Sequence, residues 1–390
     1  MSHSTIGSAP HSITRNPSAV AIASGGLIAM AVGIGVGRFV YTPILPVMML
    51  ALGLSKFAAG LIASANFAGY LAGALGATWA ALPGPRRAWL AGSLLMSAAT
   101  TAAMALTGSL AGFLVLRFLG GVASALVLIL ASSLVLDHLA LARRSGLASL
   151  HFAGVGVGIA LSAALVAAQV ATGAGWAGLW AASGAISLLG ALAVLLLVPG
   201  HAAPVAAAAA ERPRRDPRLG RMTLAYGLFG FGYVVTATFL VAMVRANPAI
   251  RGLEPVIWIV VGLAAAPSVM FWSFVGRRIG IPAGFAIAAL TEAAGVLASV
   301  VSPGALGICL AAVLVGGTFM GLTALGLMRG RELAHGDPRQ VMAAMSGAFG
   351  VGQIVGPTLA GIVSDAVGGF AVPSLAAAGA LVLAAVLARR

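Results

Sequence analysis

Twelve apolar segments, most of them about twenty residues long, follow one another through this 390-residue chain. A helix of about twenty apolar residues is long enough to cross the hydrocarbon core of a bilayer, which is about 30 Å thick. The chain is 61% hydrophobic and only 8% charged, with a mean hydropathy of +1.07, so it has no room for a sizeable soluble domain. We therefore predict an all-α integral membrane protein that crosses the bilayer twelve times.

Hydropathy also gives the expected boundaries. The spans are expected at residues 20–50, 57–81, 88–107, 110–136, 145–170, 176–198, 222–246, 256–274, 282–301, 305–328, 341–363 and 372–388. Grouped as two sets of six, they predict a tail at 1–19, a first bundle at 20–198, a linker at 199–221 and a second bundle at 222–390.

The basic residues are distributed unevenly between the loops. An even number of spans places both ends of the chain on one side of the membrane. Of the 22 Lys and Arg residues, 17 then fall on that side, and only Lys56, Arg245 and Arg251 fall on the other. Cytoplasmic loops carry the excess of Lys and Arg, so we predict that both termini are cytoplasmic. The same distribution explains the net charge of +14 without a nucleic-acid partner.

Short glycine motifs recur at an offset of about half the chain. Gly35 and Gly37 recur 195 positions later as Gly230 and Gly232. At an offset of 196, Gly120-Gly121 recurs as Gly316-Gly317, and Gly154-x-Gly156 recurs as Gly350-x-Gly352. Because each half would contain six spans, both halves enter the membrane in the same orientation. The sequence thus predicts two parallel six-helix repeats.

Two stretches carry a resemblance to a known family. The first is the run Gly37-Arg38-Phe39-Val40-Tyr41-Thr42-Pro43-x-x-Pro46, and the second is Arg117-Phe118-Leu119-Gly120-Gly121 in the fourth span. Over essentially its whole length the chain resembles the major facilitator superfamily, and the first run resembles the first-helix signature of its YbfB/YjiJ-type subfamily. This resemblance implies the major facilitator fold, alternating access, and a substrate site near the midplane, lined by spans 1, 4, 7 and 10. The loop after the second span departs from the superfamily pattern, because it lacks the usual aspartate beside Arg86 and Arg87.

Two arginines, Arg38 and Arg117, lie inside predicted spans, at similar depth in the outer half of the membrane. An arginine at the bilayer centre costs about 2.5–3.5 kcal/mol, so such residues usually face the protein interior or a water-filled path. A guanidinium stays charged and binds carboxylates and phosphates through paired hydrogen bonds, which predicts an anionic substrate at Arg38. Arg117 either contacts the substrate or, as the family resemblance allows, takes part in proton coupling. The alternative for both arginines is that they tie helices together through backbone carbonyls.

Five further polar side chains in the spans are candidates for substrate contact. Tyr41 follows Arg38 by three residues on one helix face, Tyr233 aligns with Arg38 in the repeat, and Tyr226 lies seven residues before Tyr233. A phenol can hydrogen-bond an oxyanion while its ring packs on an apolar body, although packing alone is the alternative for each. The amides of Asn66 and Gln353 either bind the substrate or hold helices together.

Two other groups could carry a proton. His151 lies toward the cytoplasmic side of the fifth span, and histidine titrates near neutral pH. Glu292 lies near the middle of the ninth span, and it is the only acid well inside any predicted span. Loss of water favours the neutral acid there, so a structural carboxylic acid and a coupling site are both open. For His151 the alternative is a neutral, hydrogen-bonded core residue.

These features predict a secondary transporter that moves a small organic anion, is driven by protons and needs no cofactor. We expect a monomer in the bacterial cytoplasmic membrane. One alternative is a drug:proton antiporter that exports hydrophobic compounds, but the first-half membrane acid usual in such proteins is missing. A membrane-embedded transferase is a second alternative. It would need clustered His, Asp or Glu residues, whereas the eight acids here are scattered.

Overall fold

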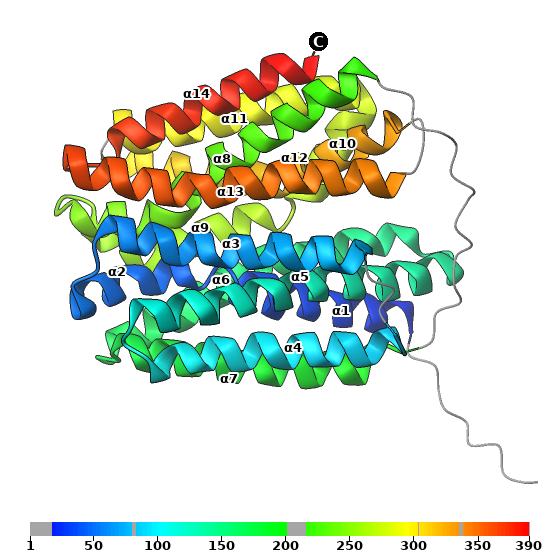
Figure 1. The fold of residues 1–390 in the computed structure, drawn as a ribbon, viewed down its shortest axis with the longest axis horizontal. Helices are drawn as coiled ribbons and strands as arrows, with labels where there is room; N and C mark the ends of the chain where they lie inside the picture. Colours follow the sequence, from blue (N-terminus) through cyan, green and yellow to red (C-terminus); the bar gives the residue numbers. More distant parts are fainter. Residues whose placement is uncertain (1–17, 80–82, 201–215, 303, 335–337, 390) are drawn as a thin grey trace, which may run out of the picture.

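The computed structural model describes residues 18–79, 83–200, 216–302, 304–334 and 338–389. All regular secondary structure in these ranges is helical (Figure 1). Most of the predicted tail at 1–19 and of the predicted linker at 199–221 lies outside the described residues. The last part of that linker is helical, since α8 already begins at Pro217.

Most helices are long enough to cross a bilayer. The α-helices are α1 (Ala19–Met30), α2 (Tyr41–Leu52), α3 (Lys56–Trp79), α4 (Arg86–Ala103), α5 (Leu110–Leu141), α6 (Ala148–Ala171), α7 (Trp176–Leu197), α8 (Pro217–Ala246), α9 (Glu254–Ala265), α10 (Ser268–Ile279), α11 (Ile281–Val301), α12 (Ala305–Glu332), α13 (Pro338–Val367) and α14 (Ala371–Arg389). A π-helical turn at Ala31–Val36 follows α1, and 3₁₀ turns lie at Met104–Leu106, Ser145–Leu147 and Arg251–Leu253.

In the described part of the chain, eleven helical segments are long and apolar enough to cross a membrane, or twelve if α9 and α10 form one broken span. The prediction of an all-helical chain with about this number of spans is therefore confirmed. Two spans that were expected to be continuous, the first and the eighth, are interrupted. The eighth span bends by 41° between α9 and α10. There Pro267 has no N–H for the carbonyl of Leu263, and its ring would clash with that carbonyl.

The helices form two groups that meet along a seam. In the first group α3 and α4 pack on α5, α4 packs on α7, and α6 packs on α1. In the second group α11 packs on α12 and α14, while α13 and α14 pack on α8. Figure 1 shows the first group below and the second above. The groups meet where α3 packs on α13, α6 on α9 and α2 on α8.

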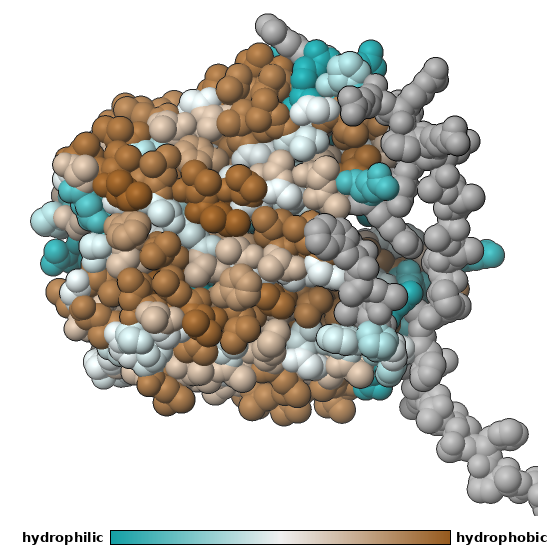
Figure 2. Space-filling model, in the orientation of Figure 1, coloured by the Kyte–Doolittle hydropathy of each residue, from teal (hydrophilic) through white to brown (hydrophobic). Residues whose placement is uncertain are grey.

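Hydrophobic side chains dominate the middle of the face shown in Figure 2, and hydrophilic residues gather toward its two ends. Large apolar side chains such as Leu189, Leu263 and Phe271 are exposed at the surface of the molecule. A continuous exposed apolar belt marks a surface that contacts a membrane. We call the right end of Figure 1, where α7 ends and α8 begins, the linker end, and the left end, where α2 meets α3, the far end.

Candidate functional site

The first span breaks between the π-helical turn and α2, next to the arginine that the sequence singled out. Pro43 has no N–H, so the normal helical bond to the carbonyl of Phe39 cannot form. The N–H of Thr42 instead bonds to that carbonyl at 3.3 Å. Within the described residues, no backbone N–H bonds the carbonyls of Gly37 and Arg38. Buried carbonyls need a partner, so another part of the molecule must supply the donors.

Arg117 on α5 supplies them. Its Nη1 donates to the carbonyl of Gly37 and its Nη2 to the carbonyl of Arg38, both at 2.9 Å. The Asn66 amide on α3 donates in turn to the Arg117 carbonyl, also at 2.9 Å. The two arginines therefore lie next to each other. The geometry favours the helix-tying alternative for Arg117, because both terminal nitrogens of its guanidinium bind backbone.

The guanidinium of Arg38 is bound quite differently. Its carbon lies 4.4 Å from the ring centre of Phe67, 4.5 Å from that of Tyr70 and 5.5 Å from that of Phe39. Arg38 is only 7% exposed, and its Nε and Nη2 are buried with no hydrogen-bond acceptor among the described residues. The three ion pairs of the described chain all involve other arginines. Arg38 is therefore a buried guanidinium that packs on aromatic rings, with two of its three nitrogens unpaired among the described residues.

An aromatic cluster with one amide faces Arg38 from the second group of helices. The ring of Phe39, next to Arg38 in the chain, contacts Phe319 of α12 with centroids 5.8 Å apart. Tyr233 on α8 contacts the same Phe319. Its ring stacks on Phe319 of α12 and on Phe349 of α13, with centroids 5.7 and 5.9 Å apart. The side-chain amide of Gln353 on α13 donates to the Tyr233 hydroxyl. Arg38, Tyr233 and Gln353, predicted separately, are therefore brought to one place between the two groups.

The hydroxyls of the other two predicted tyrosines, Tyr41 and Tyr226, bond to backbone carbonyls. The Tyr41 hydroxyl donates to the carbonyl of Ala59 at 2.8 Å, and the Tyr41 ring packs near Trp180. The Tyr226 hydroxyl bonds to the carbonyl of Thr323 at 3.3 Å, and its ring stacks on Phe349 beside the aromatic cluster. These contacts favour a packing role for Tyr41 and place Tyr226 at the edge of the cluster.

Sequence reasoning missed four aromatic residues that surround the arginine and Tyr233. They are Phe67, Tyr70, Phe319 and Phe349. A weak signal was present, because Tyr70 follows Asn66 by one helical turn and Phe349 precedes Gln353 by one turn. Such spacing also occurs in ordinary helix packing, so it becomes informative only once the helices are placed together.

The two predicted proton carriers occupy different regions. Glu292 on α11, which packs on α12, is fully buried, and neither of its carboxyl oxygens has a hydrogen-bond partner among the described residues. His151 on α6 lies 3.0 Å from the Ser132 hydroxyl and packs against Gly26 of α1. Gly26 precedes Arg38 by twelve residues, which is about 18 Å along a helix. Glu292 thus lies in the second group of helices, whereas His151 lies in the first group, toward the linker end.

Comparison with known proteins shows the family of the chain. The family model described as "Uncharacterised MFS-type transporter YbfB" matches residues 30–389, which is most of the chain. The chain belongs to this family of major facilitator superfamily transporters. The resemblance of the first-span run is thereby confirmed, and the chain is a multi-pass membrane transporter of this superfamily. A comparison with curated protein sequences gave no match.

Solved structures of other transporters share the fold. A mutant of the nucleoside transporter NupG superimposes with a TM-score of 0.73 at 14% sequence identity, covering 94% of this chain and 98% of that one. A bacterial homolog of the human lysosomal transporter Spinster, in an inward-facing and unoccupied conformation, gives a TM-score of 0.73 at 15% identity, covering 95% and 96%. At these identities the similarity shows the fold alone.

In this superfamily member the seam between α3 and α13 is closed at the far end. The Asp365 carboxylate accepts the N–H groups of Lys56 and Phe57 at 3.2 and 2.8 Å, so it caps the first turn of α3 from the other group. The ammonium of Lys56 donates to the carbonyl of Ser364 at 3.0 Å. Together these bonds join the two groups of helices at their far ends.

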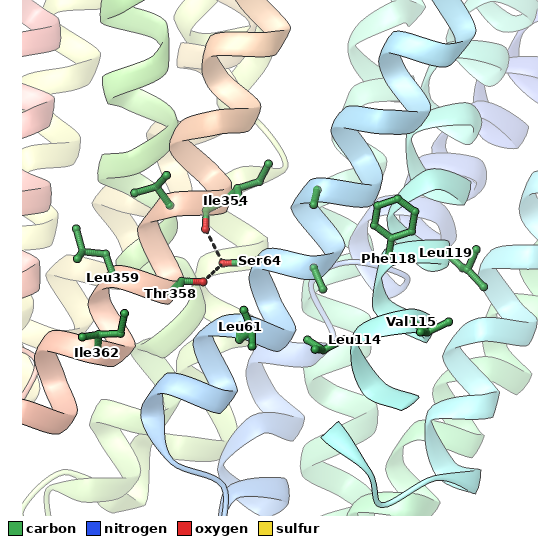
Figure 3. Close-up of a pocket in the computed structure, with 13 residues that line it drawn as sticks. Leu61, Ser64, Leu114, Val115, Phe118, Leu119, Ile354, Thr358, Leu359 and Ile362 are labelled. Atoms are coloured by element: carbon green, nitrogen blue, oxygen red, sulfur yellow. Dashed lines mark hydrogen bonds between the residues drawn. The ribbon is translucent and has the colours of Figure 1, made fainter. Parts of the chain in front are cut away.

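The same seam continues toward the middle of the membrane. Figure 3 shows the Ser64 hydroxyl donating to the carbonyl of Ile354 at 2.6 Å and accepting from Thr358 at 2.8 Å. A groove of about 780 Å³ runs outside this contact, with apolar walls from α5 and α13 that include Phe118 and Leu359. Its two hydroxyl groups already bond to each other, and no charged residue lines it. The groove therefore lacks the groups that would bind an anion.

The loop after α3 lacks the usual acid, and Arg86 of this region pairs with an acid on α5 instead. Arg86 at the start of α4 donates to the Ser133 hydroxyl at 2.9 Å and pairs with Asp137 of α5 at 3.2 Å. Asp137 had no obvious partner in the sequence, because the two residues are 51 positions apart. The ion pair lies within the first group of helices.

Proposed function

We propose that this transporter moves a small organic anion with an apolar or aromatic body by alternating access. In this proposal Arg38 binds the anionic group, while Tyr233 and Gln353 bind the remainder from the opposite side of the seam. Phe39, Phe67 and the ring of Tyr70 would enclose the apolar part.

One observation carries the proposal, namely the environment of Arg38. A buried guanidinium with unpaired N–H groups is costly, and a bidentate anion would satisfy two of them at once. Arg117, which lies beside it, has its terminal N–H groups engaged by carbonyls. The surrounding rings favour a ligand whose body packs on aromatic faces. A lipophilic cation, one kind of substrate in the antiporter alternative, would be repelled by this charge.

We further propose two parallel six-helix repeats with both termini in the cytoplasm of a bacterial cell and the chain acting as a monomer in the inner membrane. The contact between the seventh and first spans supports the repeat, since the Thr42 hydroxyl donates at 2.8 Å to the carbonyl of Ala237, one repeat offset of 195 positions later. A contact between equivalent positions is expected where a pseudo-twofold axis passes between the halves. The excess of arginine at the linker end supports the orientation.

A stabilisation screen tests the substrate class. Purified wild-type protein and the Arg38→Gln variant would be heated with a library of organic anions, lipophilic cations and neutral compounds. We expect some aromatic or apolar carboxylates or phosphates to raise the melting temperature of the wild type but not of the variant, because bound ligand stabilises the folded state. Stabilisation of both proteins by lipophilic cations would instead support the drug:proton antiporter.

Proton coupling is proposed through Glu292, because its carboxyl group is fully buried and neither of its oxygens has a hydrogen-bond partner among the described residues. The Glu292→Gln variant keeps the shape of the neutral acid but cannot exchange a proton. In proteoliposomes we expect it to retain exchange of substrate across the membrane and to lose accumulation driven by a pH gradient. His151→Gln is the matched comparison, and loss of coupling in that variant alone would move the proton site to α6.

A further inference from the structure

A second region of concentrated positive charge lies far from Arg38, at the linker end of the second group of helices. A hollow of about 230 Å³ opens there between the ends of four helices. Arg218 of α8, Arg329 of α12 and Arg389 of α14 line it, with Pro282 at the start of α11. Nothing in the proposed transport cycle uses these residues.

Two acidic side chains near the hollow, Glu332 and Asp216, balance part of the charge of the three arginines. Arg329 pairs with Glu332 on its own helix at 3.0 Å. Asp216 accepts the backbone N–H of Arg218 at 2.7 Å and so caps α8. Among the described residues, neither Arg218 nor Arg389 takes part in a salt bridge. Three arginines against these two acids leave a net positive charge among the described residues at the hollow.

The N-terminus of α11 adds to this potential, whereas that of α8 is already capped by the Asp216 carboxylate. The helix α8 begins at Pro217 and α11 begins at Ile281, so the first turns of both helices lie at the hollow. The N-terminus of a long helix carries a partial positive charge and free N–H groups, which favour anions. Arginine side chains bind phosphate oxygens through paired hydrogen bonds. Groups of both kinds converging on one hollow suit a phosphate group.

The remaining wall of the hollow is apolar. Met222, Leu333 and Leu387 line it together with Ala388, and these residues continue into helices that cross the membrane. A hollow with a basic mouth and an apolar wall at the end of membrane-spanning helices fits an amphiphile whose charged group lies at the membrane surface.

We propose that Arg218, Arg329 and Arg389 form a binding site for a phosphate group, supplied either by the headgroup of an anionic phospholipid or by a soluble phosphate. A phosphate held there bridges the ends of α8, α12 and α14. It therefore stabilises the second group of helices independently of the transported anion.

Binding to the full-length protein tests the proposal. Native mass spectrometry in detergent would measure binding of phosphatidylglycerol and of phosphatidylcholine with the same acyl chains. A thermal-shift series with inorganic phosphate, without added lipid, would test the soluble source. The pocket variant combines Arg218→Gln, Arg329→Gln and Arg389→Gln. The control variant combines Arg143→Gln, Arg144→Gln and Arg277→Gln, which remove the same charge from the same end of the molecule.

We expect the wild type to prefer phosphatidylglycerol, and the pocket variant to bind it about tenfold more weakly, while the control changes little. Stabilisation by inorganic phosphate that is lost only in the pocket variant supports the site with a soluble occupant. Equal losses in the two variants overturn the proposal, because they indicate general surface charge. Equal binding of both lipids together with no effect of phosphate also overturns it. Size-exclusion profiles that match the wild type establish that the variants are folded.

Discussion

Replacement of Arg38 by glutamine is expected to lower kcat/KM for uptake of a stabilising anion by at least about 100-fold. The variant loses a pair of charged N–H donors, and each hydrogen bond to a charged group contributes about 1.5–3 kcal/mol. The measurement is uptake of the radiolabelled anion into proteoliposomes. Arg38→Lys keeps the charge but not the planar fork, so we expect it to recover little of the activity.

A control separates loss of substrate binding from general damage to this region. Tyr41 lies three residues from Arg38, and its hydroxyl bonds to the carbonyl of Ala59 rather than toward the aromatic cluster. Tyr41→Phe is therefore expected to keep most of the transport activity. Full activity of a folded Arg38→Gln protein would refute the proposed anion site, and an inactive Tyr41→Phe protein would extend the site to α2.

Arg117→Gln is expected to affect folding more than substrate recognition. It removes both donors to the carbonyls of Gly37 and Arg38 at the break in the first span. A buried polar group left without a partner costs about 1–3 kcal/mol, so two of them remove a large part of the stability of a typical domain. We expect a large fall in melting temperature and in the yield of monodisperse protein.

The matched control for this prediction is Arg86→Gln. Arg86 forms an exposed ion pair with Asp137, with 43% of its side chain accessible, and exposed pairs contribute only about 0–1 kcal/mol. Its melting temperature should remain close to that of the wild type. If Arg117→Gln were equally stable but inactive, Arg117 would belong to the transport machinery, as the sequence also allowed.

Much of the fold followed from hydropathy, because a membrane-spanning helix needs a run of apolar residues that the sequence displays directly. The two broken spans did not follow. Pro267 and Pro43 both lie within apolar runs, and prolines in membrane helices are often accommodated without a break because neighbouring groups satisfy the freed carbonyls. Whether a break forms depends on a partner such as Arg117, which lies far away in sequence.

The candidate site was predicted in part for a similar reason. Arg38 is conspicuous because a charge in an apolar run is costly, and Tyr233 was found through the repeat. The rings of Phe67 and Phe319 are unremarkable in sequence, since an aromatic residue in a membrane helix usually packs. Their role depends on the distance to Arg38 and Tyr233, which only the packing of α3 and α12 against the site determines.

Glycines at the seam between the two groups of helices limit which substitutions the protein can accept. A side chain on Gly60 would overlap the carbonyl of Pro357, and one on Gly361 would overlap that of Lys56. Where α9 packs on α6, a side chain on Gly262 would likewise overlap the backbone of Ala160 and Gly156. Because each glycine faces main chain, no second substitution on the partner helix can make space. Even a small side chain at Gly60 or Gly361 would push α3 and α13 apart, which offers a way to trap a conformation in which the far end is open.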